Sequence, residues 1–348
     1  MGILELKLTR YRNFSSKNIV FDKDLTVIIG PNGSGKSNIL EAISLLSGVR
    51  SQKVETDADL ISFGKDEAKI EGKIESFGNN KHLTIALQAF DERRVGKAFF
   101  IDNIKKRLSD FMESLAIIVF HPADLDLVSG SPSFRRHHID QLLSVVSREY
   151  WRNLSAYNKI ITRRNKILVR ILEGKSKKNE LDFWDERLIS HGKFISRARE
   201  DFFEFLNLPS SGQVSSWNVS WELKQSLVSE EKLLRNRERD ISAGVTLSGP
   251  QRDDFRFLMR GKDLEYFGSR GEQRMAVLAL KIAELEYFQV KMGARPILAL
   301  DDIFSELDWE HREAVLEVVG KQQTIITAAE EESVPKKLLN KARLIELS

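Results

Sequence analysis

The sequence predicts an α/β fold with a head assembled from both ends of the chain, an antiparallel β part within that head, and an inserted α-helical lobe. Four observations lead to this prediction. An apolar run, a glycine-rich turn and a helical pattern follow one another from Leu25 to Leu46. Strict alternation of apolar and polar residues begins near residue 66, and a long, charged, helical region begins at Pro132. Short apolar strands return after about residue 246.

The elements follow from these patterns in chain order. Residues 3–9 and 25–29 read as strands that flank the connection "YRNFSSKNIVFDKD", and residues 37–46 read as a helix. The segments "KIEGKIE", "HLTIAL" and "KAFFID" are expected to be antiparallel strands, and "LAIIVF" a buried strand. In the lobe, "EGKSKKNELD" divides the helical region into two helices. We therefore expect a head of residues 1–120 and 246–348, with its antiparallel part at about 66–105, and a lobe of residues 121–245.

Composition excludes several classes of protein. The 348 residues are 41% hydrophobic and 30% charged, which is typical of a globular protein with a full core. The chain has no cysteine, so it has neither disulfide bonds nor a thiolate metal site. The longest apolar runs are too short to cross a bilayer, and the N-terminus lacks the apolar segment of a signal peptide. A cytoplasmic location is therefore expected.

The glycine-rich turn carries the spacing G-x-x-x-x-G-K-[ST], with Lys36 and Ser37 at its end. Glycines allow the backbone N–H groups to converge on phosphate oxygens, and the lysine adds a point charge. The following helix presents its positive end to the anion. An ordinary glycine-rich turn is the alternative, but the strand before and the helix after it favour a nucleotide-phosphate site. The residues expected to bind the nucleotide are Gly30, Pro31, Asn32, Gly33, Ser34, Gly35, Lys36, Ser37 and Asn38.

A second anionic element lies far along the chain, in "PILALDDIFSELD". A short apolar strand, residues 297–300, delivers Asp301 and Asp302 at its carboxyl end, where ligands of parallel sheets bind. We expect Asp301 and the Ser37 hydroxyl to hold Mg²⁺, and Asp302 to orient or deprotonate the attacking water. The alternative is a pair of acids that opens an exposed loop.

A third element, "SRGEQRMAVLALKIAELEYF", opens an apolar helix. Ser269 and Glu272 have the spacing of a capping box. Ser269, Gly271 and the helix N-terminus also form a second candidate anion site. The two interpretations are compatible, because a cap can receive the γ-phosphate that another molecule brings.

Basic residues concentrate between Arg148 and Lys178, where only Glu149 and Glu173 oppose ten lysines and arginines. Six of them can share one helix face, because they are spaced by three, four or seven residues. Such a face can neutralise DNA phosphates, although a solvated face or a protein interface is an equal alternative. The candidate DNA-binding residues are Arg148, Arg152, Lys159, Arg163, Lys166, Arg170 and, more weakly, Arg50.

Together, these elements resemble the heads of ABC-type ATPases of the SMC/Rad50/RecF group. In that resemblance the loop at Gly30–Ser37 is Walker A and "ILALDD" is Walker B. The signature motif, acting in trans, comprises Ser269, Gly271, Glu272 and Gln273, and the D-loop runs from Ser305 to Asp308. The insertion lacks sustained heptads, unlike the long coiled coils of SMC and Rad50. The segments Phe120–Asp140 and Ser248–Phe255 are similar to the RecF family, and the similarity spans nearly the whole chain.

The resemblance implies a DNA-binding ATPase of recombinational repair, replication and the SOS response. Such a protein binds ATP and Mg²⁺, forms ATP-dependent homodimers on single-stranded or gapped DNA or at stalled forks, and helps to load recombinase with RecO and RecR. Hydrolysis of ATP to ADP and phosphate is weak, is stimulated by DNA and drives release. The location implied is the cytoplasm, with the nucleoid.

Three residues depart from the family pattern. Arg270 and Glu272 stand where glutamine is common, and Gln251 stands where histidine is common. Transporter ATPases also place a histidine after the last strand of this site, where this chain offers Thr327, so water positioning is expected to depend on Asp302. The functional alternatives are an ATPase subunit of a transporter and an ATP-gated nuclease of the OLD type, although the latter needs an extra acidic domain.

Overall fold

The computed structural model spans residues 1–348 and describes all of them except 50–55, 92–93, 209–216 and 306–308, together with the side chains of 305, 309–311 and 314. The chain divides into two compact units. Unit 1 comprises Met1–Asp124 and Val277–Ser348, and unit 2 comprises Leu125–Ala276. The predicted return to the head at residue 246 therefore lies inside unit 2. In the described part of the chain, no helix combines the length and the apolar character that crossing a membrane requires.

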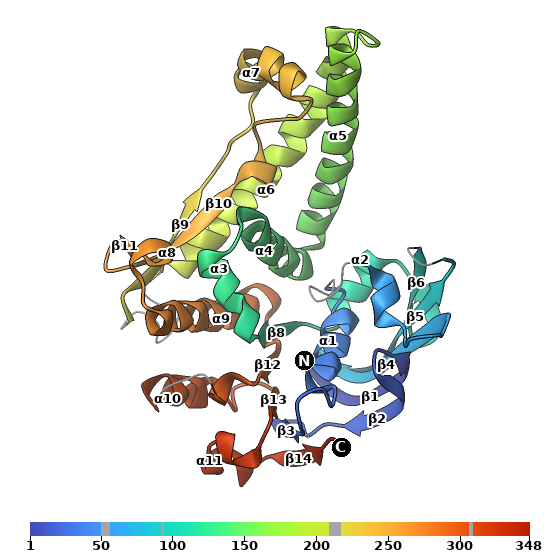
Figure 1. Cartoon of the computed structure of the whole chain (residues 1–348), viewed down its shortest axis with the longest axis vertical. Coiled ribbons are helices and arrows are strands. Elements are labelled where there is room, and N and C mark those ends of the chain that lie inside the picture. Colours follow the sequence, from blue (N-terminus) through green and yellow to red (C-terminus); the bar gives the residue numbers. More distant parts are fainter. Residues whose placement is uncertain (50–55, 92–93, 209–216, 306–308) are drawn as a thin grey trace. The chain divides into compact units, whose positions relative to one another are not determined.

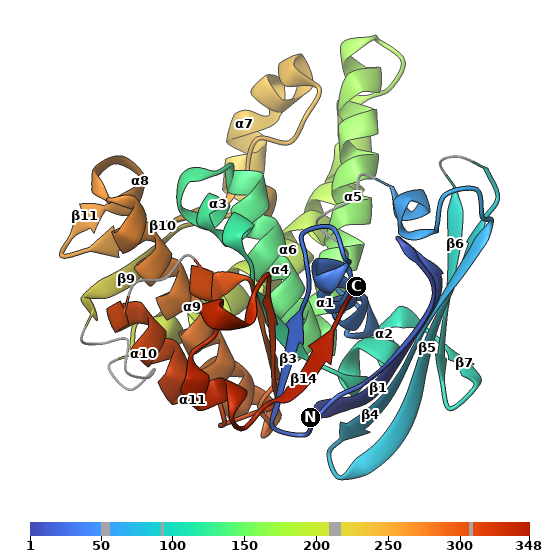
Figure 2. The ribbon, with the colours of Figure 1, turned by 60° about the horizontal axis from the view of Figure 1, so that its bottom comes forward.

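A five-stranded parallel sheet organises unit 1 (Figure 2). Its strand order is β14-β3-β13-β12-β8, so the two ends of the chain interleave in one sheet. The central strands are almost completely buried and read as continuous apolar runs, as parallel strands covered on both faces do. The sequence did not predict β14, whose short, exposed segment lacks a strand pattern. The strands are β3 (Leu25–Ile29), β8 (Ile117–Phe120), β12 (Ile297–Asp301), β13 (Thr324–Ala328) and β14 (Arg343–Glu346).

A six-stranded antiparallel sheet forms the rest of the N-terminal region, in the order β2-β1-β4-β5-β6-β7. Strict alternation of buried and exposed residues along β4 explains why its pattern was legible in the sequence. The predicted connection between residues 9 and 25 is wrong, because it contains β2, a full partner of β1. The strands are β1 (Gly2–Tyr11), β2 (Phe14–Val20), β4 (Glu67–Ser76), β5 (Asn79–Ala89), β6 (Val95–Ile101) and β7 (Ile104–Lys106).

Helix α1 (Lys36–Leu46) joins the two sheets of unit 1 into one core. Its apolar residues Ile39 and Ile43 belong to the same buried cluster as Leu6 of β1 and Ala299 of β12. The phosphate-loop helix is therefore fixed by packing on both sides. The other helices of this unit are α2 (Leu108–Phe111), α10 (Trp309–Val318) and α11 (Lys336–Leu339), and α9 (Arg270–Met292) begins in unit 2 and continues into unit 1.

Unit 2 is built on long helices, with α5 and α6 packed along one another (Figure 1). The sequence predicted one break in this region, but there is a second break at Ser147. The Ser147 side chain accepts a hydrogen bond from the Tyr150 amide, which starts a new helix. The described helices are α3 (Asp126–Ser129), α4 (Pro132–Val146), α5 (Arg148–Leu172), α6 (Asp182–Leu206), α7 (Glu230–Ala243) and α8 (Leu264–Phe267), beside a small sheet of β9 (Val219–Lys224), β10 (Asp254–Met259) and β11 (Lys262–Asp263).

Two buried arginines tie these helices together. Arg199 of α6 donates to Asp140 of α4 and to Asp253, each at 2.7 Å. Arg164 of α5 donates to Asp185 at 2.7 Å and to Asp240 at 2.8 Å. Buried ion pairs of this kind specify an arrangement, because removing one partner leaves a charge without compensation.

The segment Ser248–Phe255 has a structural role in this network. Gln251 donates to the Ser248 carbonyl at 2.9 Å and accepts a hydrogen bond from the Tyr157 hydroxyl. Gly249 has a φ of 122°, and a Cβ there would collide with that same hydroxyl, so only glycine fits. The glutamine that departs from the family pattern is therefore part of the internal packing of unit 2.

Candidate functional site

The phosphate loop, residues 30–38, is shaped by its glycines. Gly33 and Gly35 have φ values of 87° and 99°, which side chains with a Cβ rarely adopt. At Gly30 a Cβ would lie 2.5 Å from the Leu347 carbonyl, and at Gly35 it would lie 2.5 Å from the Phe14 ring. The loop thus presses against both the last residues of the chain and the start of β2.

The residues of the loop fit a bound polyphosphate. Helix α1 starts at Lys36 without a side-chain cap, so its N-terminal amides point to whatever lies in the loop. The Ser34 hydroxyl is buried and has no hydrogen-bond partner among the described residues. The Lys36 ammonium donates to the Gly30 and Pro31 carbonyls at 2.6 and 3.0 Å, within the loop itself. Phosphate oxygens would satisfy all three sets of donors.

Asp301, the last residue of β12, is the centre of the acidic half of the site. Its carboxylate is buried, and its Oδ1 accepts hydrogen bonds from Ser37 at 3.0 Å and from Thr327 at 2.7 Å. The structure thus brings together Ser37 and Asp301, the two predicted Mg²⁺ ligands, from positions 264 residues apart. Two oxygen ligands beside a phosphate loop suit Mg²⁺, which keeps waters and phosphate oxygens in its other positions. No group of three or more His, Cys, Asp or Glu side chains that could hold a metal by itself occurs in the described residues.

His121 was not among the residues that the sequence predicted. Its Nε2 lies 3.2 Å from Asp301 Oδ2, and its Nδ1 accepts a hydrogen bond from the Ala123 amide at 3.0 Å. An accepting Nδ1 leaves the proton of the neutral ring on Nε2, so the imidazole donates to the carboxylate. The sequence contained a signal for His121. This residue directly follows β8, just as Asp301 ends β12, and the two strands are parallel neighbours.

Asp302 takes an unusual backbone conformation, with a φ of 52°. Its amide donates both to the Thr327 hydroxyl and to the Thr327 carbonyl, each at 3.1 Å. Thr327 therefore holds both acids: its hydroxyl orients the Asp301 carboxylate and fixes the backbone that directs Asp302. Aspartate tolerates the left-handed region better than most residues do.

The predicted second anion site lies in unit 2. The Ser269 hydroxyl accepts from the Glu272 amide at 3.3 Å, and the Ser269 amide donates to the Glu272 carboxylate at 2.8 Å, so the capping box is formed. The Ser269 hydroxyl also donates to the Glu272 carboxylate at 2.9 Å, and the hydrogen bonds from the Ser269 amide and hydroxyl lower the pKa of Glu272. A Cβ at Gly271 would meet nothing within 4 Å, which leaves the turn open to an incoming group. The Gln273 side chain does not take part in the capping box and instead donates to the Leu264 carbonyl at 2.9 Å.

The remaining predicted residues are those of the basic face, the D-loop and Arg50. Of the six basic residues assigned to one face, all lie on α5 and five are exposed, whereas Arg148 is half-buried. Ser305 ends a short 3-10 helix, Ile303–Ser305. Arg50 and Asp308 lie outside the described residues.

A hollow of about 770 Å³ opens beside the phosphate loop and was not predicted. Asn13 connects the two, because it accepts from the Asn38 amide group at 2.9 Å and donates to the Ser34 carbonyl at 3.3 Å. Arg12, also in the lining, is held by Glu41 of α1 through bonds of 2.8 and 2.6 Å. The hollow therefore opens directly beside the loop, next to Asn13 and Asn38.

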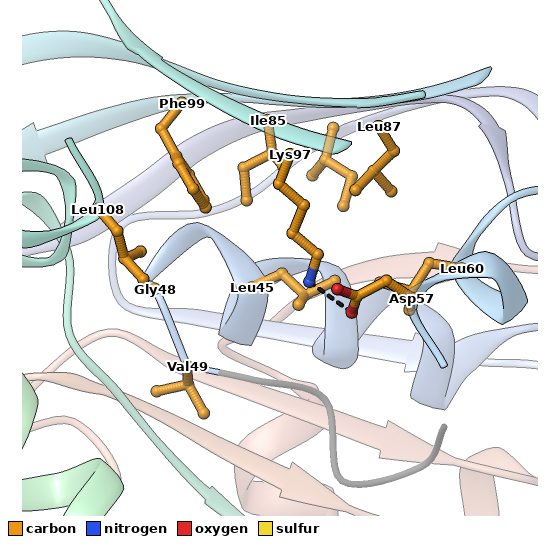
Figure 3. Close-up of a pocket in the computed structure, with 11 residues that line it drawn as sticks. Leu45, Gly48, Val49, Asp57, Leu60, Ile85, Leu87, Lys97, Phe99 and Leu108 are labelled. Atoms are coloured by element: carbon orange, nitrogen blue, oxygen red, sulfur yellow. Dashed lines mark ion pairs between the residues drawn. The ribbon is translucent and has the colours of Figure 1, made fainter. Parts of the chain in front are cut away.

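A second cavity, of about 160 Å³, lies under the antiparallel sheet (Figure 3). It is lined mainly by apolar side chains such as Leu45, Ile85 and Phe99, and Lys97 forms an ion pair with Asp57 at 2.6 Å. None of the lining residues belongs to the phosphate loop, so this cavity is separate from the site.

Comparison with known proteins places this geometry in a family. The family described as "RecF/RecN/SMC N terminal domain" matches residues 2–343. The protein "DNA replication and repair protein RecF" from Moorella thermoacetica is 35% identical over 100% of this chain and 95% of its own length. The protein of the same name from Bacillus cytotoxicus is 34% identical over 99% of the chain and 96% of its own length.

The chain belongs to the RecF family. Two solved structures support this: "the recombination mediator protein RecF-ATPrS in RecFOR pathway" has a TM-score of 0.87 at 27% identity over 99% of this chain and 96% of that one. Its counterpart "RecF-ATP" has a TM-score of 0.86 at 28% identity over 96% of this chain and 93% of that one. An Smc head domain from Pyrococcus furiosus matches at a TM-score of 0.55 and 18% identity, over 99% of this chain and 93% of that one, and shares the fold alone. The α/β fold and the family predicted from the sequence are thus confirmed.

The role of Thr327 in this RecF-family site gives a first prediction. Thr327→Val should lower the free energy of unfolding by about 1–3 kcal/mol, because the buried Asp301 and the Asp302 amide are each deprived of a hydrogen bond. Thr327→Ser retains the hydroxyl and should be destabilised much less. Urea denaturation of both variants measures the difference, and equal stability of the valine variant and the wild type would contradict the assigned hydrogen bonds.

Proposed function

We propose that this RecF-family protein is a DNA-binding ATPase of recombinational repair that dimerises when it binds ATP and dissociates after hydrolysis. The observation that carries the proposal is the hydrogen bond between Ser37 and Asp301 beside a glycine-shaped loop in which the Ser34 hydroxyl has no partner among the described residues. Related structures are described with ATP and ATPrS in the RecFOR pathway, which supports ATP as the nucleotide and RecO and RecR as partners. The names of the relatives favour DNA repair over a transporter subunit.

In the proposed mechanism, the loop amides and Lys36 bind the β- and γ-phosphates. Mg²⁺, held by Ser37 and Asp301, would neutralise phosphate charge. Asp302 orients the attacking water and accepts its proton as the bond to the γ-phosphorus forms and the bond to the leaving oxygen of ADP breaks. Thr327 and His121 hold Asp301 in place during these steps.

The signature turn supplies the other half of the site from a second copy. Ser269 and Gly271 present a helix N-terminus with no obstruction around the glycine. Closing it over the γ-phosphate of a partner links dimerisation to ATP, because a ligand shifts an equilibrium only through its different affinities for the two states. Departure of the γ-phosphate then permits release.

Ser269→Arg is expected to retain ATP binding and to abolish the ATP-dependent dimer, because the bulky cation fills the turn. Light scattering with and without ATP measures the dimer. Ser229→Arg is a matched control, since Ser229 caps α7 in the same unit through the Lys232 amide and should dimerise normally. Lys36→Met should abolish nucleotide binding itself. Dimers of wild-type strength in the Ser269 variant would rule out the trans arrangement.

Asp302→Asn is expected to trap long-lived, ATP-bound dimers, with hydrolysis lowered at least about 100-fold as for removal of a general base. Asparagine also tolerates a φ of 52°, so the backbone should be preserved. Single-turnover hydrolysis and dimer lifetime are the measurements. Turnover close to the wild-type rate would remove the catalytic role of Asp302.

The exposed face of α5 is proposed to bind DNA phosphates. Lys159→Gln with Arg163→Gln should weaken DNA binding and reduce the slope of log affinity against log salt by about 2, since two phosphates are no longer neutralised. Arg235→Gln with Arg239→Gln removes the same charge from exposed positions of α7 and should leave the slope unchanged. A flat salt dependence in the wild type would indicate a protein interface instead.

A further inference from the structure

The most exposed large hydrophobic side chains of the described chain are all aromatic. Phe63, Tyr266, Phe267 and Phe90 are exposed by 105%, 74%, 73% and 72%, more than any other large hydrophobic residue described. Isolated apolar residues on a surface are normal, but large exposed aromatic rings that lie near one another mark interaction sites. These four residues form two pairs, and each pair adjoins one half of the proposed ATP site.

Phe63 and Phe90, here called the rim pair, both line the hollow beside the phosphate loop. The backbone around Phe63 is fixed: the Ser62 amide donates to the Arg10 carbonyl at 2.9 Å, and the Ser62 hydroxyl donates to the Arg12 carbonyl at 2.8 Å. The Phe90 amide donates to the Arg94 carbonyl at 2.8 Å. The two rings are thus presented to solvent by an ordered backbone.

Tyr266 and Phe267, here called the turn pair, end helix α8 and precede the signature serine by three and two residues. Leu264 anchors this short helix in the core of unit 2, and its carbonyl accepts hydrogen bonds from Gln273 and Gly268. At Gly268 a Cβ would lie 2.8 Å from that carbonyl, which holds the chain tightly there. The anchor directs both aromatic rings outward beside Ser269.

Geometry connects the two pairs across a dimer. A turn that brings Ser269 to the phosphates must bring residues two or three positions earlier within roughly 10 Å of the loop, at about 3.5 Å per residue. The lining of the hollow that carries the rim pair also includes Asn38 of the loop, so the loop and the rim pair border the same hollow. Both halves belong to one sequence, so a symmetric dimer contains the same interface twice.

We propose that the rim pair of one copy packs against the turn pair of a second copy and forms an aromatic clamp that closes the dimer around the nucleotide. The proposal rests on the proposed trans arrangement and adds the residues that supply its apolar packing. Aromatic side chains dominate the energetics of protein interfaces, and here they flank a polar, charged site. Within the single chain these four rings remain largely exposed.

Two double variants test the clamp. Phe63→Ser with Phe90→Ser removes the rim pair, and Tyr266→Ser with Phe267→Ser removes the turn pair. Each should weaken ATP-dependent dimerisation by at least about tenfold, as expected when buried aromatic pairs are removed from an interface. Because all four side chains are exposed, the thermal stability of each variant should equal that of the wild type. Phe77→Ser with Ile104→Ser removes two other exposed apolar residues and should dimerise normally.

Mixing the two variants gives the decisive result. Each homodimer has both of its clamps incomplete, whereas the mixed dimer has one complete clamp and one with neither pair. An equal mixture should therefore form more ATP-dependent dimer than either variant alone, as measured by analytical ultracentrifugation. A mixture no better than its components would overturn the clamp.

A second measurement tests the alternative that the rim pair stacks on the base of the nucleotide within one chain. ATP affinity is compared in the Ser269→Arg background, which remains monomeric in the proposal. Removal of the rim pair should leave this affinity unchanged, and a weaker affinity would assign the rings to the base and overturn the clamp. Wild-type protein that does not dimerise with ATP would instead overturn the proposed function, and the clamp with it.

Discussion

The site depends on one buried carboxylate, that of Asp301. It accepts hydrogen bonds from Ser37 at the start of α1 and from Thr327 in β13, and it lies beside His121 at the end of β8. These residues come from both ends of the chain, and no short segment contains them. Because the carboxyl ends of parallel strands share one edge of a sheet, the fold converts distant sequence segments into one polar centre. The phosphate loop acquires its partner acid only through this sheet.

Unit 2 uses a comparable principle for a different purpose. Arg164 and Arg199 are almost completely buried, and each bridges elements distant in sequence through two aspartates. The net stabilisation from such networks is small, because desolvation offsets most of the Coulombic gain, whereas removal of one partner is costly because it leaves a buried charge without compensation. In this protein they fix the long helices that carry the exposed basic face, and they hold the base of the segment Ser248–Phe255. Helix α5 carries both kinds of arginine: Arg164 is buried in the network, whereas its neighbour Arg163 is exposed to solvent.

The phosphate loop and the capped turn at Ser269 differ in character. The phosphate loop has donors and an adjoining hollow with an apolar rim, whereas the signature turn has an open glycine and an apolar neighbour. An arrangement in which one copy completes the site of another would make assembly depend on the nucleotide.

The sequence by itself determined the features that depend on local geometry. The spacing of Gly30, Gly35 and Lys36 specifies the loop, the pair Ser269 and Glu272 specifies the cap, and alternation specifies β4. The fold class and the family followed from these motifs and their order. Only the tertiary structure decided which side chains support Asp301, that β2 and β14 join their sheets, and that Arg164 is buried. The physical reason is that short strands and buried polar groups are stabilised by partners that lie far away in the sequence, so their own sequences carry little of the information that places them.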